Sequence, residues 1–390
     1  MSVVNCLNVA SHLDPRFGGI ASSLPPLCSE LERQGRYHSP LAGFCLPDEQ
    51  LAVPDCAFVT HRFSQSWVRW ITDPAMRSRL SSLVVDASIC HIHGIWEPHC
   101  AITSGLARKL GRPYVISAHG MLDPWALRQK PWKKRIYSQL LEFRSLSSAA
   151  CLRALTANEA EQYRQFGLKN PIVVIPNGVE VPLSAKADVF EERYPHLRGK
   201  RIVLFMGRLH TKKGLIPLCR CWSGVASRFP DAHLVIAGPD SEGIEPQLRK
   251  ILADCGGNSS VTFTGLLAGD VKWSAYASAN LFILPSYSEG FSVAILESLG
   301  TGTPVAISHN CYFPDVPAAG AGWLTGVTES EIDTVLSIAL NTPAAELAAM
   351  GRNGAKLVAD KYSWIKVASQ FAELYDWILG GNAPASFAVL

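Results

Sequence analysis

Hydrophobic and polar positions alternate along this chain in a rhythm that predicts parallel β-sheets covered by helices. Short apolar runs, typical of buried strands, are followed by longer stretches with apolar residues three and four positions apart. In the first half the predicted strands are Val3–Val9, Ser88–Ile92, Pro113–Ser117, Cys151–Thr156 and Ile172–Ile175, and the predicted helices are Ile20–Gln34, Ala101–Leu110 and Pro131–Leu146. In the second half the predicted strands are Arg201–Met206, His233–Ala237, Val261–Thr264, Leu281–Leu284 and Pro304–Ile307. The pattern predicts an α/β protein with doubly wound parallel sheets and right-handed crossovers.

The length of the chain predicts more than one domain. It has 390 residues, whereas a single hydrophobic core rarely grows beyond roughly 250–300 residues. The turn sequence Pro176-Asn177-Gly178-Val179 and a polar segment at 184–200 separate the halves. We therefore expect one Rossmann-like domain over residues 1–180 and a second over 181–361, facing each other across a deep cleft. A helix at 362–380 is expected to pack back across the junction, and the tail after it to be loosely held.

Composition excludes several classes of protein. A hydrophobic content of 48% and a charged content of 18% describe a packed globular protein, and the net charge of +3 is too small to indicate nucleic-acid binding. The 11 cysteines form no C-x-x-C pair, which favours reduced thiols in a cytoplasmic protein. The N-terminus has no basic segment of a signal peptide, and the longest uncharged stretch, Trp273–Ser288, contains Pro285. We expect a cytoplasmic protein that is soluble or at most peripheral to the membrane.

Candidate chemistry in the second half begins with two cations. Arg208 and Lys213 stand in a glycine-bounded loop after the predicted strand Arg201–Met206. In open α/β sheets, ligands bind at the carboxyl ends of strands, and fixed cations there stabilise the charge of a departing diphosphate. A metal clamp would show as paired aspartates, and Asp-x-Asp occurs nowhere in the chain. The alternative is an ordinary solvated loop.

Two carboxylates follow in the same half of the chain. Glu289 precedes a predicted helix and Glu297 lies eight residues later, a spacing expected to put them on one helical face, two turns apart. The helix start at Gly290, Phe291 and Ser292 offers backbone N–H groups to a phosphate. Carboxylates suit sugar hydroxyls, so cations and carboxylates together indicate a nucleotide-sugar. The alternatives are an exposed helix glutamate, a partner for the helix dipole, and a glycosidase acid/base pair, which leaves the cations without a role.

The first half carries weaker signals. Gly18 and Gly19 precede a predicted helix, as in a phosphate-contacting turn or a tight structural turn. His91 and His93 end one predicted strand, and His119 follows the next, where an imidazole could hydrogen-bond a sugar. Zinc binding is an alternative for His-x-His, but no cysteine or carboxylate set completes a site, and we expect His91 to be a structural histidine.

A basic and aromatic stretch spans Arg128–Arg135. One interpretation is contact with anionic lipid headgroups or with a lipid diphosphate. A solvated helix face with core aromatics is equally consistent with the pattern. The first interpretation predicts a protein that works at the inner face of the plasma membrane.

These residues resemble the retaining glycosyltransferases of family 4, which have the GT-B fold of two Rossmann-like domains. The resemblance spans nearly the whole chain in the expected order. The matching elements are Gly18-Gly19, His119-Gly120, Pro176–Val179, Gly207-Arg208-Leu209, Lys213-Gly214, Ala237-Gly238-Pro239, Gly265, Ser288–Phe291 with Glu297, and Gly302–Val305. Ser292 departs from the family pattern, in which Pro or Leu is common, and the carboxylates and glycines are kept.

The resemblance implies a donor site in the second domain and an acceptor site in the first. Arg208 and Lys213 would hold the diphosphate, Glu297 the ribose and Glu289 the sugar, while His119 would face the sugar as a further catalytic residue. The donor-binding set it implies is Gly18, Gly19, Arg208, Lys213, Gly238, Gly265, Leu266 (the last two near the base), Glu289, Gly290, Phe291, Ser292 and Glu297. The runs His93-Gly94-Ile95-Trp96 and Met121-Leu122-Asp123-Pro124-Trp125 resemble a bacterial subset that builds surface polysaccharides, so His93, Trp96 and Asp123 are candidates for acceptor contact.

The expected reaction is transfer of a sugar from a nucleotide-diphospho-sugar to a glycan or a polyprenyl-diphosphate-linked acceptor. Configuration would be retained, and neither a metal nor another cofactor is expected. Two alternatives use similar sites. A non-hydrolysing sugar-nucleotide epimerase needs further acid and base carboxylates, of which the first half shows no clear set. A catalytically silent binding protein is disfavoured because Arg208, Lys213, Glu289 and Glu297 are all present.

Overall fold

A computed structural model describes residues 3–14, 19–46, 60–123, 142–182 and 187–390. The chain divides into two compact units. The N-terminal unit comprises residues 1–178 with 364–390, and the C-terminal unit comprises residues 179–363. The two segments that connect the units pair with each other, because the Val179 amide donates to the Tyr362 carbonyl at 2.8 Å and Val179 bridges Ser363. Gly178 lies beside the Trp364 ring, where a Cβ atom would come within 2.6 Å.

The N-terminal unit is built on a parallel sheet in the order β4-β3-β1-β5-β6-β7-β8, with β2 pairing β1. Its strands are β1 (Val4–Ala10), β2 (Tyr37–His38), β3 (Leu41–Cys45), β4 (Thr60–Ser64), β5 (Ile89–His93), β6 (Tyr114–Ser117), β7 (Cys151–Ala154) and β8 (Ile172–Val174). Its helices are α1 (Gly19–Arg33), α2 (Trp67–Thr72), α3 (Pro74–Asp86), α4 (Pro98–Lys109), α7 (Phe143–Ser147), α8 (Ala157–Gln165) and α17 (Trp364–Ile378).

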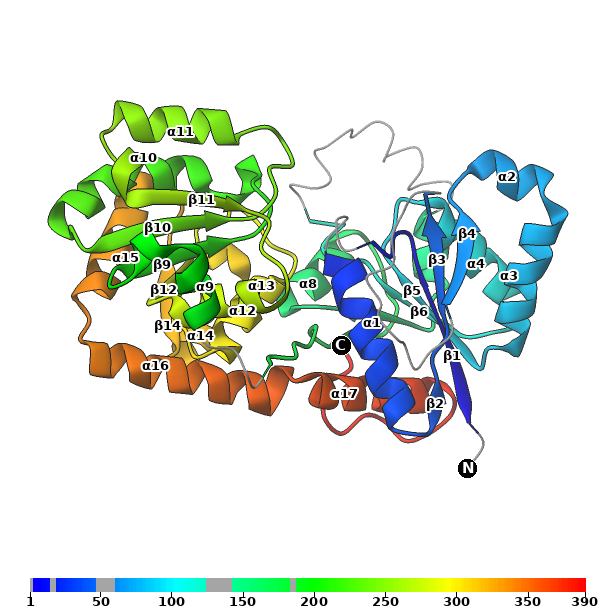
Figure 1. The fold of residues 1–390 in the computed structure, drawn as a ribbon. Coiled ribbons are helices and arrows are strands. Elements are labelled where there is room, and N and C mark those ends of the chain that lie inside the picture. The colour runs from blue at the N-terminus through cyan, green and yellow to red at the C-terminus, as the bar shows by residue number, and fades with distance from the viewer. Residues whose placement is uncertain (1–2, 15–18, 47–59, 124–141, 183–186) are drawn as a thin grey trace. The chain divides into compact units, whose positions relative to one another are not determined.

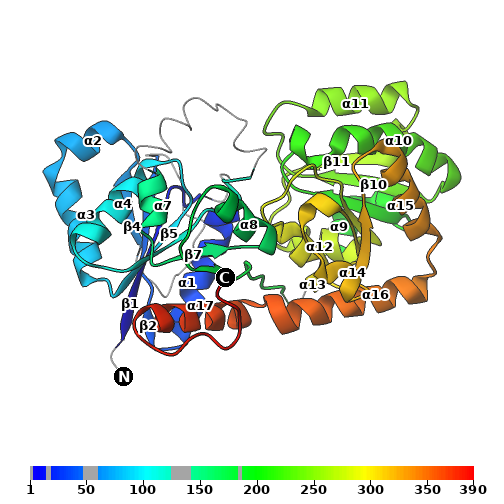
Figure 2. The same ribbon diagram turned by 180° about the vertical axis from the view of Figure 1, so that it is seen from behind.

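Helices cover both faces of this sheet, and each face has its own core. One face packs against α1 and α17, which lie side by side in Figures 1 and 2. Helix α1 forms an apolar stripe because Leu24, Leu27, Cys28 and Leu31 recur at helical spacing and are all buried. The other face packs against α3, α4, α7 and α8. The helix expected from the 362–380 pattern is thus α17, and its apolar residues belong to the core of the N-terminal unit.

The C-terminal unit has a six-stranded parallel sheet in the order β11-β10-β9-β12-β13-β14. Its strands are β9 (Arg201–Met206), β10 (Ala232–Ala237), β11 (Val261–Gly265), β12 (Leu281–Leu284), β13 (Val305–Ser308) and β14 (Gly322–Thr325). Its helices are α9 (Asp188–Arg193), α10 (Leu215–Arg228), α11 (Glu245–Asp254), α12 (Gly269–Ser278), α13 (Val293–Gly300), α14 (Asp315–Ala318), α15 (Glu329–Asn341) and α16 (Ala344–Leu357), with a π-helical turn at Val358–Tyr362.

The central strands of this sheet are buried on both faces, which explains their nearly continuous apolar sequences. Helices α10, α11 and α15 pack together, and α9 packs with α12, consistent with helices on both faces of the sheet. The predicted fold class, two doubly wound parallel sheets, is confirmed.

The predicted strands are confirmed within one or two residues at each end, but the sequence pattern missed others. Strands β3, β4 and β14 lie in stretches whose apolar runs are short or broken by polar residues. The expectation of a loose C-terminal tail is wrong, because Leu390 exchanges two backbone hydrogen bonds with Ile172 at the edge of β8, at 2.8 and 3.2 Å. The tail pairs with the sheet there through its backbone groups. Such pairing needs no apolar side-chain pattern, so the sequence did not reveal it.

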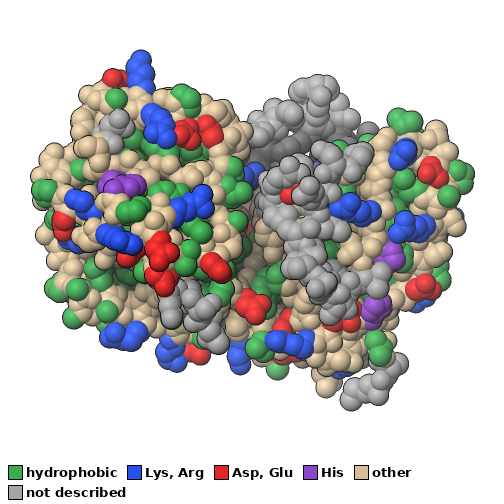
Figure 3. Space-filling view, viewed as in Figure 1, with side chains coloured by type: hydrophobic (Ala, Val, Ile, Leu, Met, Phe, Trp, Pro, Cys, Tyr) green, Lys and Arg blue, Asp and Glu red, His purple; other side chains and the backbone are tan. Residues whose placement is uncertain are grey.

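The surface and the thiols agree with the compositional expectations. On the face in Figure 3, Lys and Arg side chains are interspersed with Asp and Glu over the residues that the structure describes. The ten cysteines among these residues are all free thiols, and only Cys255 is exposed. Within the described part of the chain, no helix is both long and apolar enough to cross a membrane.

Candidate active site

The strand order of the C-terminal unit changes direction between β9 and β12. Successive connections from β9 lead outward through β10 to β11, and those from β12 lead outward on the other side through β13 to β14. The loops that follow β9 and β12 therefore separate at their carboxyl ends, which is where open α/β sheets bind ligands. Two of the predicted residues, Lys213 and Glu289, lie on these two loops.

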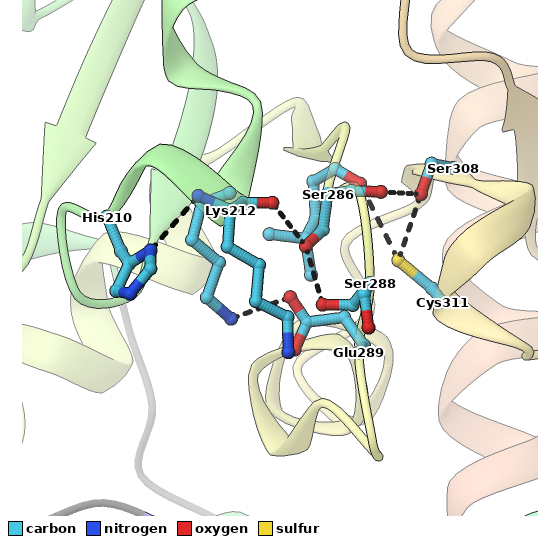
Figure 4. Close-up of polar contacts among 9 residues, drawn as sticks. His210, Lys212, Ser286, Ser288, Glu289, Ser308 and Cys311 are labelled. Carbon is cyan, nitrogen blue, oxygen red and sulfur yellow. Dashed lines mark hydrogen bonds and ion pairs between the residues drawn. The ribbon is translucent and has the colours of Figure 1, made fainter. Parts of the chain in front are cut away.

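Lys213 and Glu289 form an ion pair across this point. The distance from Lys213 Nζ to Glu289 Oε1 is 2.7 Å, and the two side chains are 18% and 8% exposed. Figure 4 shows Glu289 and Ser286 on one loop facing His210 and Lys212 on the other. The pair joins residues that are 76 positions apart in the sequence.

The protonation state of Glu289 is set by its lysine. Burial is the largest single influence and raises the pKa of this carboxyl group, but the charge and hydrogen bond of Lys213, with smaller contributions from Ser286 and Lys212, together outweigh it. The pKa of Glu289 lies below its ordinary value as a result. Glu289 is therefore a carboxylate at neutral pH, with the second oxygen able to accept a hydrogen bond from a ligand hydroxyl.

Backbone packing fixes the distance between the two loops. The Ser286 hydroxyl donates to the Lys212 carbonyl at 3.0 Å, and the Tyr287 amide donates to the same carbonyl at 2.8 Å. Gly214 has φ +71°, and a Cβ atom there would lie 2.0 Å from the Pro285 carbonyl oxygen. Only glycine combines the left-handed backbone with so close an approach, so this residue allows Lys213 to reach Glu289.

The neighbouring loops meet in the same way. The Gly238 amide donates to the Gly265 carbonyl at 2.8 Å, and a Cβ atom on Gly238 would lie 1.9 Å from the Gly207 carbonyl oxygen. Leu266 is 64% exposed beside them. Arg208 is also exposed, and no hydrogen bond or ion pair links its guanidinium to the described residues. Of the cations on this loop, Lys213 is therefore paired with Glu289, whereas Arg208 has no such partner among the described residues.

The expected geometry of the second carboxylate is wrong in one respect. Helix α13 begins at Val293 with Ser292 as N-cap, so Glu289 and Gly290 precede the helix and Glu297 lies only about one turn inside it. Helical spacing therefore does not put Glu289 and Glu297 on one face. Phe291 instead packs beside the Phe313 and Tyr362 rings, with centroid distances of 5.6 and 6.2 Å.

Glu297 has partners on α12 that the sequence reasoning missed. Lys272 Nζ lies 2.5 Å from Glu297 Oε1, and the Tyr276 hydroxyl donates to Glu297 Oε2 at 2.9 Å. The two donors fix the carboxylate plane, and Lys272 also lies over the Trp273 ring, 4.6 Å from its centroid. Lys272 and Tyr276 are four positions apart on α12, a spacing that puts two side chains on one helical face. This spacing was the sequence signal from which the two partners of Glu297 could have been found.

The sheet of the N-terminal unit changes direction between β1 and β5, and polar side chains gather there too. His93 ends β5, and its Nε2 lies 3.2 Å from Asn8 Oδ1 on β1. His93 Nδ1 lies 3.2 Å from Nε2 of His119, which follows β6. Burial and neighbouring positive groups lower the pKa of both His93 and His119 well below its ordinary value, so both rings are neutral at pH 7.

His91, the third histidine of the predicted cluster, has a different environment. His91 is fully buried between the Tyr375 hydroxyl at 2.7 Å and the Ser117 hydroxyl at 2.8 Å, as expected of a structural histidine. Its ring stacks on His93 with centroids 4.0 Å apart. Within the described residues, no group of three His, Cys, Asp or Glu side chains could hold a metal ion.

Trp96 and His119 are non-glycine residues at this edge with left-handed backbones, at φ 71° and 54°. The Trp96 amide donates to Glu142 Oε1 at 3.2 Å, and its indole donates to the Met121 carbonyl at 3.0 Å. Glu142 is fully buried, and burial raises its pKa to about 7. Strained backbones cluster at functional sites and persist only where surrounding contacts hold them, as these contacts do for Trp96.

The remaining predicted residues of this unit are Asp123, Gly18, Gly19 and those of the stretch Arg128–Arg135. Asp123 is buried and accepts from Gln162 Nε2 at 3.3 Å. Gly19 begins α1, whereas Gly18 and Arg128–Arg135 lie outside the residues that the structure describes. A buried carboxylate, Glu159, accepts from the Gly120 amide at 2.6 Å and the Leu155 amide at 2.7 Å, and so fixes the loop after His119. The sequence reasoning missed Glu159 and Glu142, because neither stands in a recognisable motif.

Comparison with known families adds to this geometry. Residues 188–357 match the model of the glycosyl transferases group 1, and residues 18–178 match the glycosyl transferase 4-like domain. The chain is a glycosyltransferase. The two matches lie one in each unit, and the expected resemblance is confirmed.

Curated relatives cover almost the whole chain. The phosphatidyl-myo-inositol mannosyltransferase of Mycolicibacterium smegmatis is 26% identical over 375 residues, which are 94% of this chain and 92% of the relative. The GDP-mannose:cellobiosyl-diphosphopolyprenol alpha-mannosyltransferase of Xanthomonas campestris is 26% identical over 302 residues, 75% of each chain.

Solved structures confirm the GT-B fold of this glycosyltransferase. The sucrose-phosphate synthase of Thermosynechococcus elongatus superposes with a TM-score of 0.78 at 18% identity, over 96% of this chain and 99% of the other. Anabaena Alr3699/HepE, solved in complex with UDP and glucose, gives a TM-score of 0.75 at 16% identity, over 96% and 100% of the two chains. At these identities the likeness is one of fold.

Proposed function

We propose that this glycosyltransferase transfers mannose from a nucleotide-diphospho-mannose to a lipid-linked acceptor, with retention of configuration and without a metal. The observation that carries the proposal is the Lys213–Glu289 pair at the point where the strand order changes, with the exposed Arg208 on the same loop as Lys213. This pairing supports the proposal because a cation suits a leaving diphosphate and a carboxylate suits sugar hydroxyls.

The proposed division of roles follows from charge and exposure. Arg208 and Lys213 bind the diphosphate and stabilise the negative charge that develops when the sugar leaves. Glu289, held ionised by Lys213, accepts hydrogen bonds from sugar hydroxyls. Glu297, oriented by Lys272 and Tyr276, accepts from the ribose, and the backbone at Gly265 and Leu266 borders the base. For His119 the family resemblance implies a hydrogen bond to the sugar.

Relatives supply the substrate classes to test first. The curated names cited above describe mannosyl transfer to phosphatidylinositol and to an oligosaccharide on diphosphopolyprenol, the second from GDP-mannose. Both acceptors carry a lipid, so we propose a lipid-linked acceptor for this chain, at the inner face of the plasma membrane. The family assignment favours transfer over the epimerase and over the silent binding protein.

A ligand panel tests the donor. Thermal unfolding would be followed with GDP, UDP, ADP and their sugars, because a ligand that binds only the folded state raises its stability by mass action, by about 2.7 kcal/mol at 100 times the Kd. We expect GDP and GDP-mannose to stabilise most. Stabilisation by UDP alone would contradict the guanine donor and leave the diphosphate site intact.

A chelator tests the cation-loop mechanism. With GDP-mannose and a membrane lipid extract as acceptor, we expect transfer of labelled mannose to continue in excess EDTA. A strict requirement for added divalent metal would contradict the roles given to Arg208 and Lys213. Conversion of GDP-mannose to an epimeric nucleotide-sugar, without a labelled lipid product, would favour the epimerase.

A further inference from the structure

A line of hydrogen-bonded side chains crosses the sheet of the N-terminal unit and ends at His119. It runs from Ser39 through Asn8 on β1 and His93 on β5 to the imidazole of His119 after β6. Asn8 is fully buried and His93 is 2% exposed, whereas His119 is partly exposed. His93 uses both of its ring nitrogens within this line, so it has no ring atom left to bind a substrate.

The orientation of the Asn8 amide fixes the first proton. Its Nδ2 lies 3.1 Å from the Cys6 carbonyl oxygen and 2.9 Å from Ser39 Oγ. A carbonyl oxygen only accepts, so the atom facing it must be the amide nitrogen, and Oδ1 must face His93. Because Oδ1 also only accepts, the hydrogen of the neutral His93 ring is on Nε2.

The second proton follows from the first. A neutral imidazole carries one hydrogen, so His93 Nδ1 is an acceptor with a bare lone pair. The nitrogen that faces it at 3.2 Å, Nε2 of His119, must therefore donate. The buried guanidinium of Arg153 also disfavours a positive charge on His119. The ring of His119 is then neutral with its hydrogen on Nε2, and its Nδ1 has no hydrogen-bond partner among the described residues.

We propose that Asn8 and His93 are positioning residues that hold His119 in the Nε2–H tautomer, so that its Nδ1 accepts a hydrogen bond from a hydroxyl of the transferred sugar. This inference rests on the proposed function for the identity of the ligand, and on the hydrogen bonds of Asn8, His93 and His119 for the tautomer. Asn8 contacts no substrate in this account. It acts through two imidazoles, in the way that an outer hydrogen bond sets the tautomer of a catalytic histidine.

The assignment predicts a specificity. A bare Nδ1 accepts from a hydroxyl and repels a hydrogen-bond acceptor at the same place. A donor sugar that lacks the matching hydroxyl should lose the bond, whereas the opposite tautomer would present an N–H and favour a ligand oxygen that accepts. One monodeoxy donor in a series should therefore be a poor substrate for the wild type, by up to about tenfold in kcat/KM.

Nitrogen-15 NMR of the protein labelled at histidine tests the tautomer directly. Protonated and bare ring nitrogens differ strongly in chemical shift, and a His119→Gln spectrum identifies the signals of this ring. We expect the His119 signals of the wild type to show Nε2 protonated and Nδ1 bare. In Asn8→Leu, which removes the acceptor at similar volume, we expect the His119 signals to move toward a mixture of tautomers.

A matched control separates this role from general packing. Ser39→Ala also removes a hydrogen-bond partner of Asn8, but Cys6 still orients the amide, so the tautomer of His119 should not change. The monodeoxy series supplies the second measurement, and Asn8→Leu should lose the discrimination seen in the wild type while Ser39→Ala keeps it.

Either of two results overturns the proposal. The first is a wild-type His119 with Nδ1 protonated, or with both ring nitrogens protonated, at pH 7. Because this measurement uses the wild-type protein, it can contradict the proposal even if Asn8→Leu folds poorly. An unchanged tautomer in a folded Asn8→Leu contradicts the role of Asn8. Failure of GDP-mannose as a donor would count against the proposed function and leave the NMR result to decide the tautomer.

Discussion

The two sheets of this glycosyltransferase differ in the side chains at the point where the strand order reverses, which are charged in one sheet and uncharged in the other. At the strand reversal of the C-terminal unit, full charges meet in the Lys213–Glu289 ion pair. At the strand reversal of the N-terminal unit, the side chains in contact are an amide and two neutral imidazoles. The same sheet topology therefore positions a charged site that suits a diphosphate and an uncharged one that suits hydroxyls. The fold provides the place, and the side chains decide what is bound.

The largest expected effect comes from removing either charge in the C-terminal unit. Lys213→Ala and Glu289→Ala should each reduce transfer by about 100-fold or more, because each removes a group that acts on developing charge or on the sugar. Steady-state kinetics with the donor would measure this. Arg228→Ala is the matched control, since it breaks the Arg228–Asp333 pair of 2.6 Å on the surface of the same unit and should leave turnover within about twofold. Unchanged turnover in the folded Lys213 or Glu289 variant would refute the site.

A second prediction isolates the close approach of the two loops. Gly214→Ala should abolish transfer and lower the unfolding free energy by about 2–3 kcal/mol, since φ +71° and the Pro285 carbonyl both oppose a Cβ atom. Gly199→Ala is the control, because Gly199 has a similar φ of +74° with nothing within 4 Å of a Cβ. It should cost only about 1 kcal/mol in urea unfolding. Equal losses would show that backbone strain alone accounts for Gly214.

A third prediction uses the sign of the pH dependence in the C-terminal unit. Glu289 has a lowered pKa in the wild type, so its contribution to stability is present above the unfolded value of 4.5 and is lost as pH falls through the folded pKa. In Lys213→Met the burial remains without the cation, so the pKa of Glu289 should rise above 4.5 and stability should fall as pH rises. Urea unfolding of both proteins from pH 4 to pH 8 would show the difference. Parallel pH profiles would contradict the coupling.

The last prediction concerns the N-terminal unit, where an effect on stability but not on turnover is expected at Glu142. Burial raises the pKa of Glu142 from 4.5 to about 7, so the folded protein retains a proton that the unfolded chain releases, and stability falls as pH rises across that window. Glu142→Gln keeps an acceptor for the Trp96 amide and removes the titration. It should be more stable than the wild type at pH 8, by about 3 kcal/mol at most, and nearly equal at pH 4. An advantage of the same size at both pH values would exclude titration of Glu142 as the cause.

The sequence predicted the charged site better than the uncharged one, for a physical reason. Glycine-bounded loops with Lys213 and Glu289 follow strongly apolar strands, so local patterns locate them at a sheet edge. The carboxylate–lysine pairing could not be predicted, because it joins loops 76 residues apart. The eight-residue spacing between Glu289 and Glu297 led to a wrong prediction that both lie on one helical face, since the helix starts only at Val293.

The uncharged line depends on sheet register, which a single sequence does not reveal. Asn8 is one polar residue in an apolar strand, and its meaning appears only when β1 pairs with β5 and brings it opposite His91, beside His93. The strands β3, β4 and β14 were missed for a related reason, because they are short and their neighbours, more than their own apolar pattern, hold them in the sheet.

The central claim is that cations of the C-terminal unit hold the diphosphate of the donor, and nucleotide affinity tests it most directly. Calorimetry would compare a nucleoside diphosphate with its monophosphate for the wild type, Arg208→Ala and Lys213→Ala. We predict that the wild type prefers the diphosphate by tenfold or more, about 1.4 kcal/mol, and that each variant loses most of this preference. A preference of the same size in all three proteins would contradict the claim.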